Sequence, residues 1–368
     1  MSDRLAVFYD ERVLGHDTGF GFFEAPSSPF LEIQERHPEN AERLRNMASV
    51  LRTGPISDAL DWHPATPAVR EDLLLFHAPD YLEGLEFLDT AVTSRETSTT
   101  VFGPGSWPIV KIAAGLAIAA ARHVWSGKGN IAYAMTRPPG HHAQPSMADG
   151  YCFVNNIGVA IGVLRREGLK RACVIDWDVH HGNGTQEGFY DDADILTVSL
   201  HMDHGAWGKS HPQTGGAEEV GLGSGKGANL NIPLPYGSGD TAYRKAFDEI
   251  VAPAVRDFSP EILFIAAGQD ASQFDPNGRQ IVTMEGFRQL GQRARALADE
   301  VSDGKLVLVQ EGGCALSYAA YCLHATLEGV LGRNSQLTDP IAFMPEHLEN
   351  LDQVLERVQG IRNQALRK

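Results

Sequence analysis

The stretch Ala172-Cys-Val-Ile-Asp-Trp-Asp-Val-His-His181 joins a run of apolar residues to a cluster of carboxylates and imidazoles. The segment from Ala172 to Asp176 has the length and composition of a buried strand. Side chains of the types that bind metals follow it at once, at Asp178 and His180. In a parallel sheet, sites form at the carboxyl ends of strands, so this stretch predicts a site at that edge.

Other apolar runs along the chain resemble this strand in length and character. They alternate with segments of helical periodicity, and such alternation predicts a parallel sheet covered on both faces. The expected strands are Leu5–Tyr9, Ile131–Met135, Ala172–Asp176, Ile195–Leu200, Ile262–Ala267 and Leu306–Gln310. The expected helices are Pro38–Arg52, Trp107–Trp125, Asn155–Arg166, Thr241–Asp257, Met284–Val301 and Ser317–Leu331. We therefore expect a fold of the α/β class.

Length and charge limit the kind of protein this can be. Of the 368 residues, 43% are hydrophobic, which is enough for a large core. No linker divides the chain, so we expect a single domain over residues 1–368, with 345–368 as a charged surface helix or an oligomer contact. The formal net charge of −16 argues against nucleic-acid binding, because a phosphate backbone needs a basic face.

Nothing in the sequence predicts export or a membrane span. The N-terminus lacks a basic run followed by an apolar stretch, and charged residues interrupt the most apolar segment, Val110 to Val124. The four cysteines show neither disulfide-framework nor zinc-finger spacing. We expect a cytoplasmic protein that has no membrane or nucleic-acid partner and forms a homo-oligomer, either a dimer or a tetramer.

The residues after two of the strands predict a metal site. Asp178 and His180 are two apart, so on an extended segment both would point to the same side. Asp270 follows the strand that ends at Ala267. Two carboxylates and an imidazole suit Zn²⁺, whose catalytic sites have three protein ligands and one open position. The spacing alone also fits a cluster of Asp–His hydrogen bonds at a strand end.

His141 and His142 form the second cluster of reactive side chains. They follow Pro138-Pro-Gly140, a rigid turn that would aim adjacent imidazoles into a site. Hydrolysis at neutral pH needs a base and an acid, and imidazole, with an ordinary pKa of about 6.5, suits both tasks. Each ring needs an orienting partner, and Asp176 and Asn183 are available. A hydrogen-bonded loop without a catalytic role is the alternative.

Taken together, these segments resemble the histone deacetylase and acetylpolyamine amidohydrolase superfamily. The matching motifs, in order and spacing, are Arg137-Pro-Pro-Gly-His-His142, Gly150-Tyr-Cys-Phe153, Asp176-Trp-Asp-Val-His-His-Gly-Asn-Gly-Thr185, Val198-Ser-Leu-His201 and Glu311-Gly-Gly313. Weaker similarity runs from His37 through His324. Asn183 is similar to the class II pattern and to bacterial deacetylase-like amidohydrolases. The resemblance implies an arginase–deacetylase fold, with a central, mostly parallel sheet of about eight strands, and zinc-dependent hydrolysis of N-acyl amines.

The resemblance also implies roles for individual residues. It assigns one Zn²⁺ to Asp178, His180 and Asp270. It makes His141 with Asp176, and His142 with Asn183, the groups that move protons. A structural K⁺ would contact Asp176, Ser199 and the backbone carbonyls of Asp178, His180 and Leu200. The implied substrate contacts are Gly150, which would accept a hydrogen bond from the amide, Tyr151, which would line the acyl tunnel, and further Trp207, Gln269 and Gly313.

Two positions depart from the family pattern. Relatives carry a tyrosine that hydrogen-bonds the substrate carbonyl where this chain has Cys314, whose S–H is a weak donor. Loss of one oxyanion donor lowers rates by about 10²–10³-fold. We therefore expect activity on activated or unusual acyl groups, and poor activity on acetyl-lysine unless another donor substitutes. Gln269, where relatives commonly have Phe, predicts either a loop-stabilising amide or a more polar pocket.

Three functions remain open from the sequence. The first is hydrolysis of acyl-lysine-like, acylpolyamine or related small amides. The second is hydrolysis of small xenobiotic amides, anilides or activated esters, which the missing tyrosine favours. The third is binding of acylated ligands with little turnover, against which the complete metal triad and histidine pair argue. Tyr318 and Tyr321 are expected to pack on the following helix, and no feature supports Cys314 as a covalent nucleophile.

Overall fold

The computed structural model describes residues 4–21, 29–90, 94–95, 100–204, 213–339, 341–342, 344–346 and 348–367. Its core is an eight-stranded sheet in the order β2-β1-β5-β10-β9-β6-β7-β8, with every neighbouring pair parallel. The strands are β1 Leu5–Phe8, β2 Leu60–His63, β5 Ile131–Ala134, β6 Ala172–Asp176, β7 Ile195–Met202, β8 Asn229–Leu234, β9 Ile262–Ala267 and β10 Leu306–Gln310. A separate antiparallel pair joins β3 (Ser94–Arg95) to β4 (Val101–Phe102).

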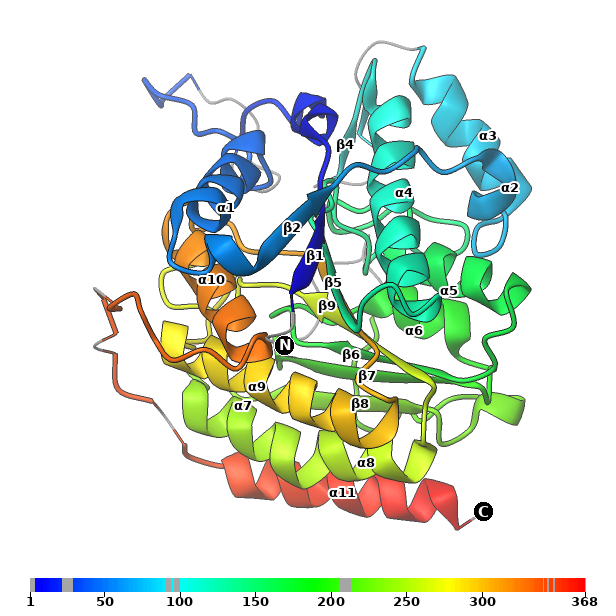
Figure 1. Ribbon diagram of the computed structural model, residues 1–368, viewed down its shortest axis with the longest axis vertical. Helices are drawn as coiled ribbons and strands as arrows, with labels where there is room; N and C mark the ends of the chain where they lie inside the picture. Colours follow the sequence, from blue (N-terminus) through cyan, green and yellow to red (C-terminus); the bar gives the residue numbers. More distant parts are fainter. Residues whose placement is uncertain are drawn as a thin grey trace.

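Helices cover both faces of this sheet (Figure 1). Helices α4 and α5 pack together on one face, while α9 contacts α7, α8 and α10 on the other, and α10 also contacts α1. Helix α11 lies against the edge strand β8. The helices are α1 Ala41–Thr53, α2 Arg70–Leu73, α3 Pro79–Leu88, α4 Ser106–Trp125, α5 Asn156–Arg166, α6 Asn183–Phe189, α7 Asp240–Ala246, α8 Ala252–Phe258, α9 Met284–Val301, α10 Tyr318–Val330 and α11 Leu351–Leu366.

The sequence-based elements agree with this single α/β domain, apart from the two edge strands and the helices α2, α3 and α6. All the expected strands are present, but β2 and β8 were missed because polar residues such as Asp61 and Asn231 interrupt their apolar pattern. The expected helix Thr241–Asp257 is present and contains a π-helical turn at Phe247–Val251.

Helix α4 is the described helix that is long and apolar enough to cross a membrane. In the fold, 72% of its apolar window is buried, and it contacts β1, β5 and β10. It therefore serves as a core helix of this domain.

The sheet order brings the reactive loops together. Strands β10, β9 and β6 are neighbours, so the segments that follow them leave the sheet at one edge. Asp176 pairs in register with Ala266 on β9 and with Ser199 on β7. Strand β5, which precedes the histidine pair, lies on the other side of β10. Parallel pairing alone thus gathers segments that lie far apart in sequence.

Candidate active site

Asp178, His180 and Asp270 converge at the carboxyl ends of β6 and β9. One ligand atom from each lies within 4.8 Å of the other two. His180 Nδ1 is 3.1 Å from Asp178 Oδ1 and 3.2 Å from Asp270 Oδ2, and all three side chains are buried. Glycine is needed beside them, because a Cβ on Gly312 would lie 2.0 Å from Asp270 Oδ2 and one on Gly268 would lie 2.2 Å from Asp178 Oδ2.

The expected extended geometry of Asp178 and His180 is wrong. Strand β6 ends at Asp176, and the next residues form a series of bends. The backbone N–H of Asp178 donates to Asp176 Oδ1 at 3.0 Å, and that of His180 donates to Asp178 Oδ1 at 2.9 Å. Asp270 Oδ1 accepts the N–H of Val179 at 2.9 Å. These side-chain-to-backbone bonds, and not strand alternation, bring the candidate ligands together.

This donor set fits a divalent cation such as Zn²⁺. Burial and the neighbouring Asp178 carboxylate both raise the pKa of Asp270. Burial would also raise the pKa of Asp178, but the imidazoles of His141 and His180 keep it below its ordinary range. Two adjacent buried carboxylates are costly without a cation between them. Two oxygen ligands and one imidazole nitrogen also leave the open position of a catalytic site.

The histidine pair lies beside the candidate ligands, with its ring centroids 4.0 Å apart. His141 Nδ1 is 2.9 Å from Asp176 Oδ2, and His142 Nδ1 is 2.5 Å from Asn183 Oδ1. Asn183 Nδ2 donates to Asp149 Oδ2 at 3.1 Å, which directs its carbonyl oxygen toward His142. His142 Nδ1 therefore carries a proton, and Nε2 is the basic nitrogen of the neutral ring.

The two histidines differ in their electrostatic surroundings. Burial would lower the pKa of His141, but the carboxylates of Asp178 and Asp176 raise it well above its ordinary value. Burial and the charge on His141 lower the pKa of His142 to about 3. At neutral pH the pair therefore combines one protonated ring with one neutral ring, an arrangement suited to moving a proton.

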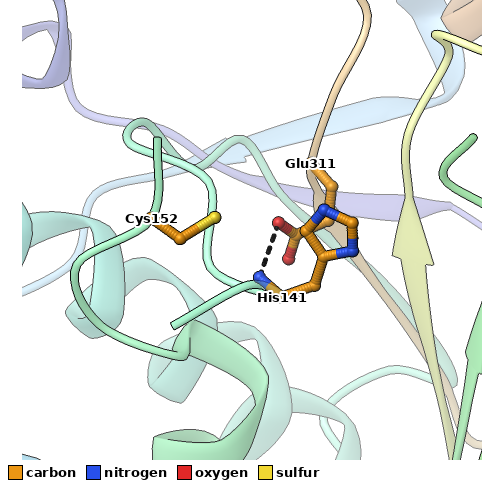
Figure 2. A group of neighbouring side chains, drawn as sticks. All are labelled: His141, Cys152 and Glu311. Atoms are coloured by element: carbon orange, nitrogen blue, oxygen red, sulfur yellow. Dashed lines mark hydrogen bonds between the residues drawn. The ribbon is translucent and has the colours of Figure 1, made fainter. Parts of the chain in front are cut away.

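A second group of candidate ligands, His141, Cys152 and Glu311, includes the first histidine of the pair (Figure 2). The backbone N–H groups of Gly140 and His141 donate to Glu311 Oε2 at 2.6 and 3.1 Å. Burial raises the pKa of Glu311 to about 8 and that of Cys152 well above its ordinary value. Both groups therefore hold their protons at neutral pH and are poor cation ligands. Glu311 instead secures the turn that carries the histidines.

The loop that carries Cys314 is held from two sides. The N–H of Cys314 donates to Asp275 Oδ2 at 2.6 Å. The Arg43 guanidinium donates to the carbonyls of Gly313 and Glu311 at 2.6 and 2.7 Å. Burial raises the pKa of the Cys314 thiol well above its ordinary value, although Arg43 opposes this shift. A protonated thiol is a weak nucleophile, so the geometry gives no support to covalent attack by Cys314.

Gln269 lies in the interior and not on a pocket surface. Its side chain is fully buried, its Nε2 donates to the carbonyl of Ala267 at 2.8 Å, and its Oε1 accepts from Gln310 Nε2 at 2.8 Å. These bonds favour the loop-stabilising role over a substrate contact.

The side chains of Tyr318 and Tyr321 do not replace the missing tyrosine at position 314. Tyr318 Oη donates to Asp339 at 2.7 Å, and Tyr321 is exposed.

Of the remaining predicted site residues, the structure describes Gly150, Ser199 and Leu200 but not Trp207. A Cβ on Gly150 would lie 2.2 Å from the His142 ring, so Gly150 packs directly on that histidine. Ser199 Oγ contacts His201 Nδ1 at 2.9 Å, and both Ser199 and Leu200 lie on β7 beside β6. The potassium site there stays a prediction. Trp207 lies outside the described residues.

Several contributors to this region were given no role by the sequence analysis. Glu39 lies just before α1 and Arg43 lies in its first turn, and Arg137 completes a buried ion cluster with them. Asn277 lies in the turn Asp275-Pro-Asn-Gly278, a few residues beyond Asp270. The proximity of that turn to a candidate ligand is a signal that could have marked Asn277.

Comparison with known proteins places this geometry in context. Residues 37–330 match the model of the histone deacetylase domain. The chain is 49% identical to histone deacetylase 8 of Arabidopsis thaliana, across 97% of this chain and 96% of that protein. It is 39% identical to a histone deacetylase-like amidohydrolase of Pseudomonas aeruginosa, across 93% of this chain and 90% of that protein.

A solved structure agrees with these sequence relatives. The crystal structure of the HDA15 HD domain superposes with a TM-score of 0.84 at 32% sequence identity, covering 98% of this chain and 95% of that one. The all-parallel sheet and the single α/β domain match the arginase–deacetylase fold. The chain belongs to the histone deacetylase family. Membership of this family supports metal-dependent hydrolysis of amide bonds as its general activity.

Proposed function

We propose that this protein hydrolyses the amide bond of N-acyl amines, with Zn²⁺ as its metal. The substrate class comprises acyl-lysine-like side chains, acylpolyamines and related small amides. One observation carries the proposal: a three-ligand cluster of Asp178, His180 and Asp270 lies beside two histidines that each have a separate orienting partner. This arrangement supports hydrolysis by an activated water.

The residues that would hold the ion are Asp178, His180 and Asp270. A divalent ion bound there supplies Lewis acidity at an open coordination position. The pair His141 and His142 takes the proton of the attacking water, because His142 Nε2 is the free basic nitrogen. His142 then protonates the leaving amine. Asp176 and Asn183 hold the two rings in the orientation that these transfers need.

A second candidate function is hydrolysis of small xenobiotic amides, anilides or activated esters. The specific observation in its favour is Cys314, since a thiol is a weak hydrogen-bond donor to a developing oxyanion. Anilides and activated esters depend less on such a donor, because their leaving groups withdraw electron density from the carbonyl.

A substrate panel separates the two candidates. The purified protein with stoichiometric zinc is assayed on acetyl-lysine peptide, trifluoroacetyl-lysine peptide, acetylputrescine and acetanilide. The proposal expects kcat/KM to be highest for an amine-linked acyl group among the first three substrates. A clear preference for acetanilide supports the second candidate. Absence of turnover on every substrate, in a protein that is folded and metal-loaded, contradicts both.

A further inference from the structure

Three polar side chains meet on loops of which two also pack against His142 and Asp270. Tyr151, Asn277 and Cys314, together called the polar wall here, are linked through the Asn277 amide. Asn277 Nδ2 lies 3.4 Å from Tyr151 Oη and 3.6 Å from Cys314 Sγ. The hydroxyl and the thiol thus lie on either side of one amide nitrogen.

The loops that carry Tyr151 and Cys314 each contact one part of the candidate site. Tyr151 follows Gly150, where an added Cβ would lie 2.2 Å from the His142 ring. Cys314 comes two residues after Gly312, where an added Cβ would lie 2.0 Å from Asp270 Oδ2. The two loops that carry Tyr151 and Cys314 therefore pack against both parts of the candidate site, the histidine pair and the ligand cluster.

The Tyr151 hydroxyl has a proton to give. Its oxygen accepts from Asn277, and within the described parts of the chain no group accepts its proton. Burial raises the pKa of Tyr151 well above its ordinary value, so the hydroxyl stays protonated at neutral pH. Accepting a hydrogen bond from Asn277 also strengthens the hydroxyl as a donor, since linked hydrogen bonds polarise one another.

The residue is held firmly in an uncommon conformation. Tyr151 has φ of 71°, in the left-handed region that bulky residues seldom adopt. Its N–H donates to Thr100 Oγ1 at 3.0 Å, and its ring packs edge-on against His37 with centroids 4.7 Å apart. Backbone strain of this kind persists where the surroundings enforce it, and it is concentrated at functional sites.

We propose that the Tyr151 hydroxyl, positioned by the Asn277 amide, donates the hydrogen bond that stabilises the oxyanion of the substrate. The inference rests on the amide hydrolysis proposed above and adds the donor that Cys314 cannot supply well. Tyr151 is then a catalytic residue that keeps its proton throughout, and Asn277 is a positioning residue. A rigid, buried donor aimed at developing charge is worth more than the same donor in water.

The first test is Tyr151→Phe, with Tyr318→Phe as the matched control. The Tyr318 hydroxyl also has a buried setting, but it donates to Asp339 and not to the polar wall. Tyr151→Phe should lower kcat and kcat/KM equally, by about 10²-fold, because the lost bond forms only in the transition state. Tyr318→Phe should leave both unchanged. Equal kinetics for Tyr151→Phe and the unmodified protein would overturn the proposal.

Rescue provides a sharper test. Cys314→Tyr should raise kcat little in the unmodified protein but restore most of the loss in the Tyr151→Phe background, because it offers a replacement phenol. An equal gain in both backgrounds would mean that Tyr151 supplies no donor. Asn277→Leu should lower kcat in the unmodified protein and have no further effect once Tyr151 is Phe, whereas a merely structural role would give additive losses.

A binding measurement tests the role of Tyr151 without relying on substrate turnover. A trifluoromethyl ketone analogue of acetyl-lysine, which hydrates to a tetrahedral form, is titrated calorimetrically against a matched methyl ketone. Tyr151→Phe should weaken the first by about 10²-fold and leave the second unchanged. Equal weakening of both, or of neither, contradicts the proposal. If the unmodified protein hydrolyses no amide, the proposed function fails while this titration still decides the role of Tyr151.

Discussion

The ligand cluster and the polar wall lie side by side, but the chain builds them in different ways. The ligand cluster follows directly from strand ends, since Asp178 and Asp270 come within four residues of β6 and β9. The polar wall joins Tyr151, Asn277 and Cys314 from three separate loops. The difference teaches that the carboxyl ends of two strands place the ligand cluster, whereas the polar wall depends on the paths of three loops.

The largest effect should follow from His142→Ala. Removing the neutral imidazole takes away the base and acid of the reaction, so kcat should fall by about 10²–10⁴-fold, with little change in KM. Steady-state kinetics on the best substrate of the panel measure this loss. The matched control is His63→Ala at the end of β2, far from the ligand cluster in the sheet order. Full activity of His142→Ala would refute the assignment of proton transfer to this pair.

The buried ion cluster of Glu39, Arg43 and Arg137 should contribute to the free energy of unfolding. Glu39 is buried between Arg43 and Arg137, so Glu39→Gln leaves two buried cations uncompensated and should cost about 3–5 kcal/mol of unfolding free energy. Chemical denaturation measures this cost. The control Glu42→Gln removes an exposed pair with Arg36 and should change stability by less than about 0.5 kcal/mol.

The stability lost in Glu39→Gln should depend on pH, and the direction follows from the pKa of Glu39. Burial would raise the pKa of Glu39, but Arg137 and Arg43 lower it from 4.5 to about 2. A lowered folded pKa stabilises the protein above pH 4.5, and that contribution is lost as the pH falls from 4.5 toward 2. The stability gap between the unmodified protein and Glu39→Gln should therefore narrow over that range. A gap that widens on acidification would contradict the ion-pair account.

An added methyl group should distort the ligand cluster without altering a ligand. A Cβ on Gly312 would lie 2.0 Å from Asp270 Oδ2 and 2.5 Å from Asp178 Oδ2. Gly312→Ala should therefore weaken zinc affinity by about 10–100-fold, the range seen when groups around metal ligands are changed. Competition with a fluorescent chelator measures the affinity. Gly360→Ala on α11, where the added Cβ meets open space, should have no effect, and equal affinities for both variants would argue against this packing.

The smallest effect concerns the partner of His142. Asn183 orients the ring without charge, whereas Asn183→Asp would place a carboxylate there and raise the pKa of His142 from its low value of about 3. The base would then be protonated at higher pH, so the acidic limb of the kcat/KM profile should move upward. Asn46→Asp, which lies on α1 and bonds the carbonyl of Leu316, serves as the control. An unmoved acidic limb would mean that His142 is not the base.

The sequence predicted the sheet interior better than its edges. Strands such as β9 and β10 are continuous apolar runs because helices cover both of their faces. The edge strand β8 carries Asn229 and Asn231, whose amides bond to Gln186, so its pattern was not that of a buried strand. The order of the strands was not predicted, because periodicity along the chain does not say which strands are neighbours.

The candidate site was predictable to a similar, limited degree. The ligand cluster and histidine pair could be found because their side chains follow strands in short motifs. Asn277 was missed because its contact with Tyr151 spans 126 positions in the chain and depends on the path of two loops. Gln269 was open to two interpretations, since burial decides whether an amide supports a loop or lines a pocket.

The central claim is that a divalent ion held by Asp178, His180 and Asp270 is needed for amide hydrolysis. The most direct measurement follows hydrolysis and bound metal together while the protein is dialysed against dipicolinate and then titrated with Zn²⁺. The account predicts that activity falls in proportion to metal content, with folding retained, and returns at one zinc per chain. Undiminished hydrolysis by protein shown to be free of metal would contradict it.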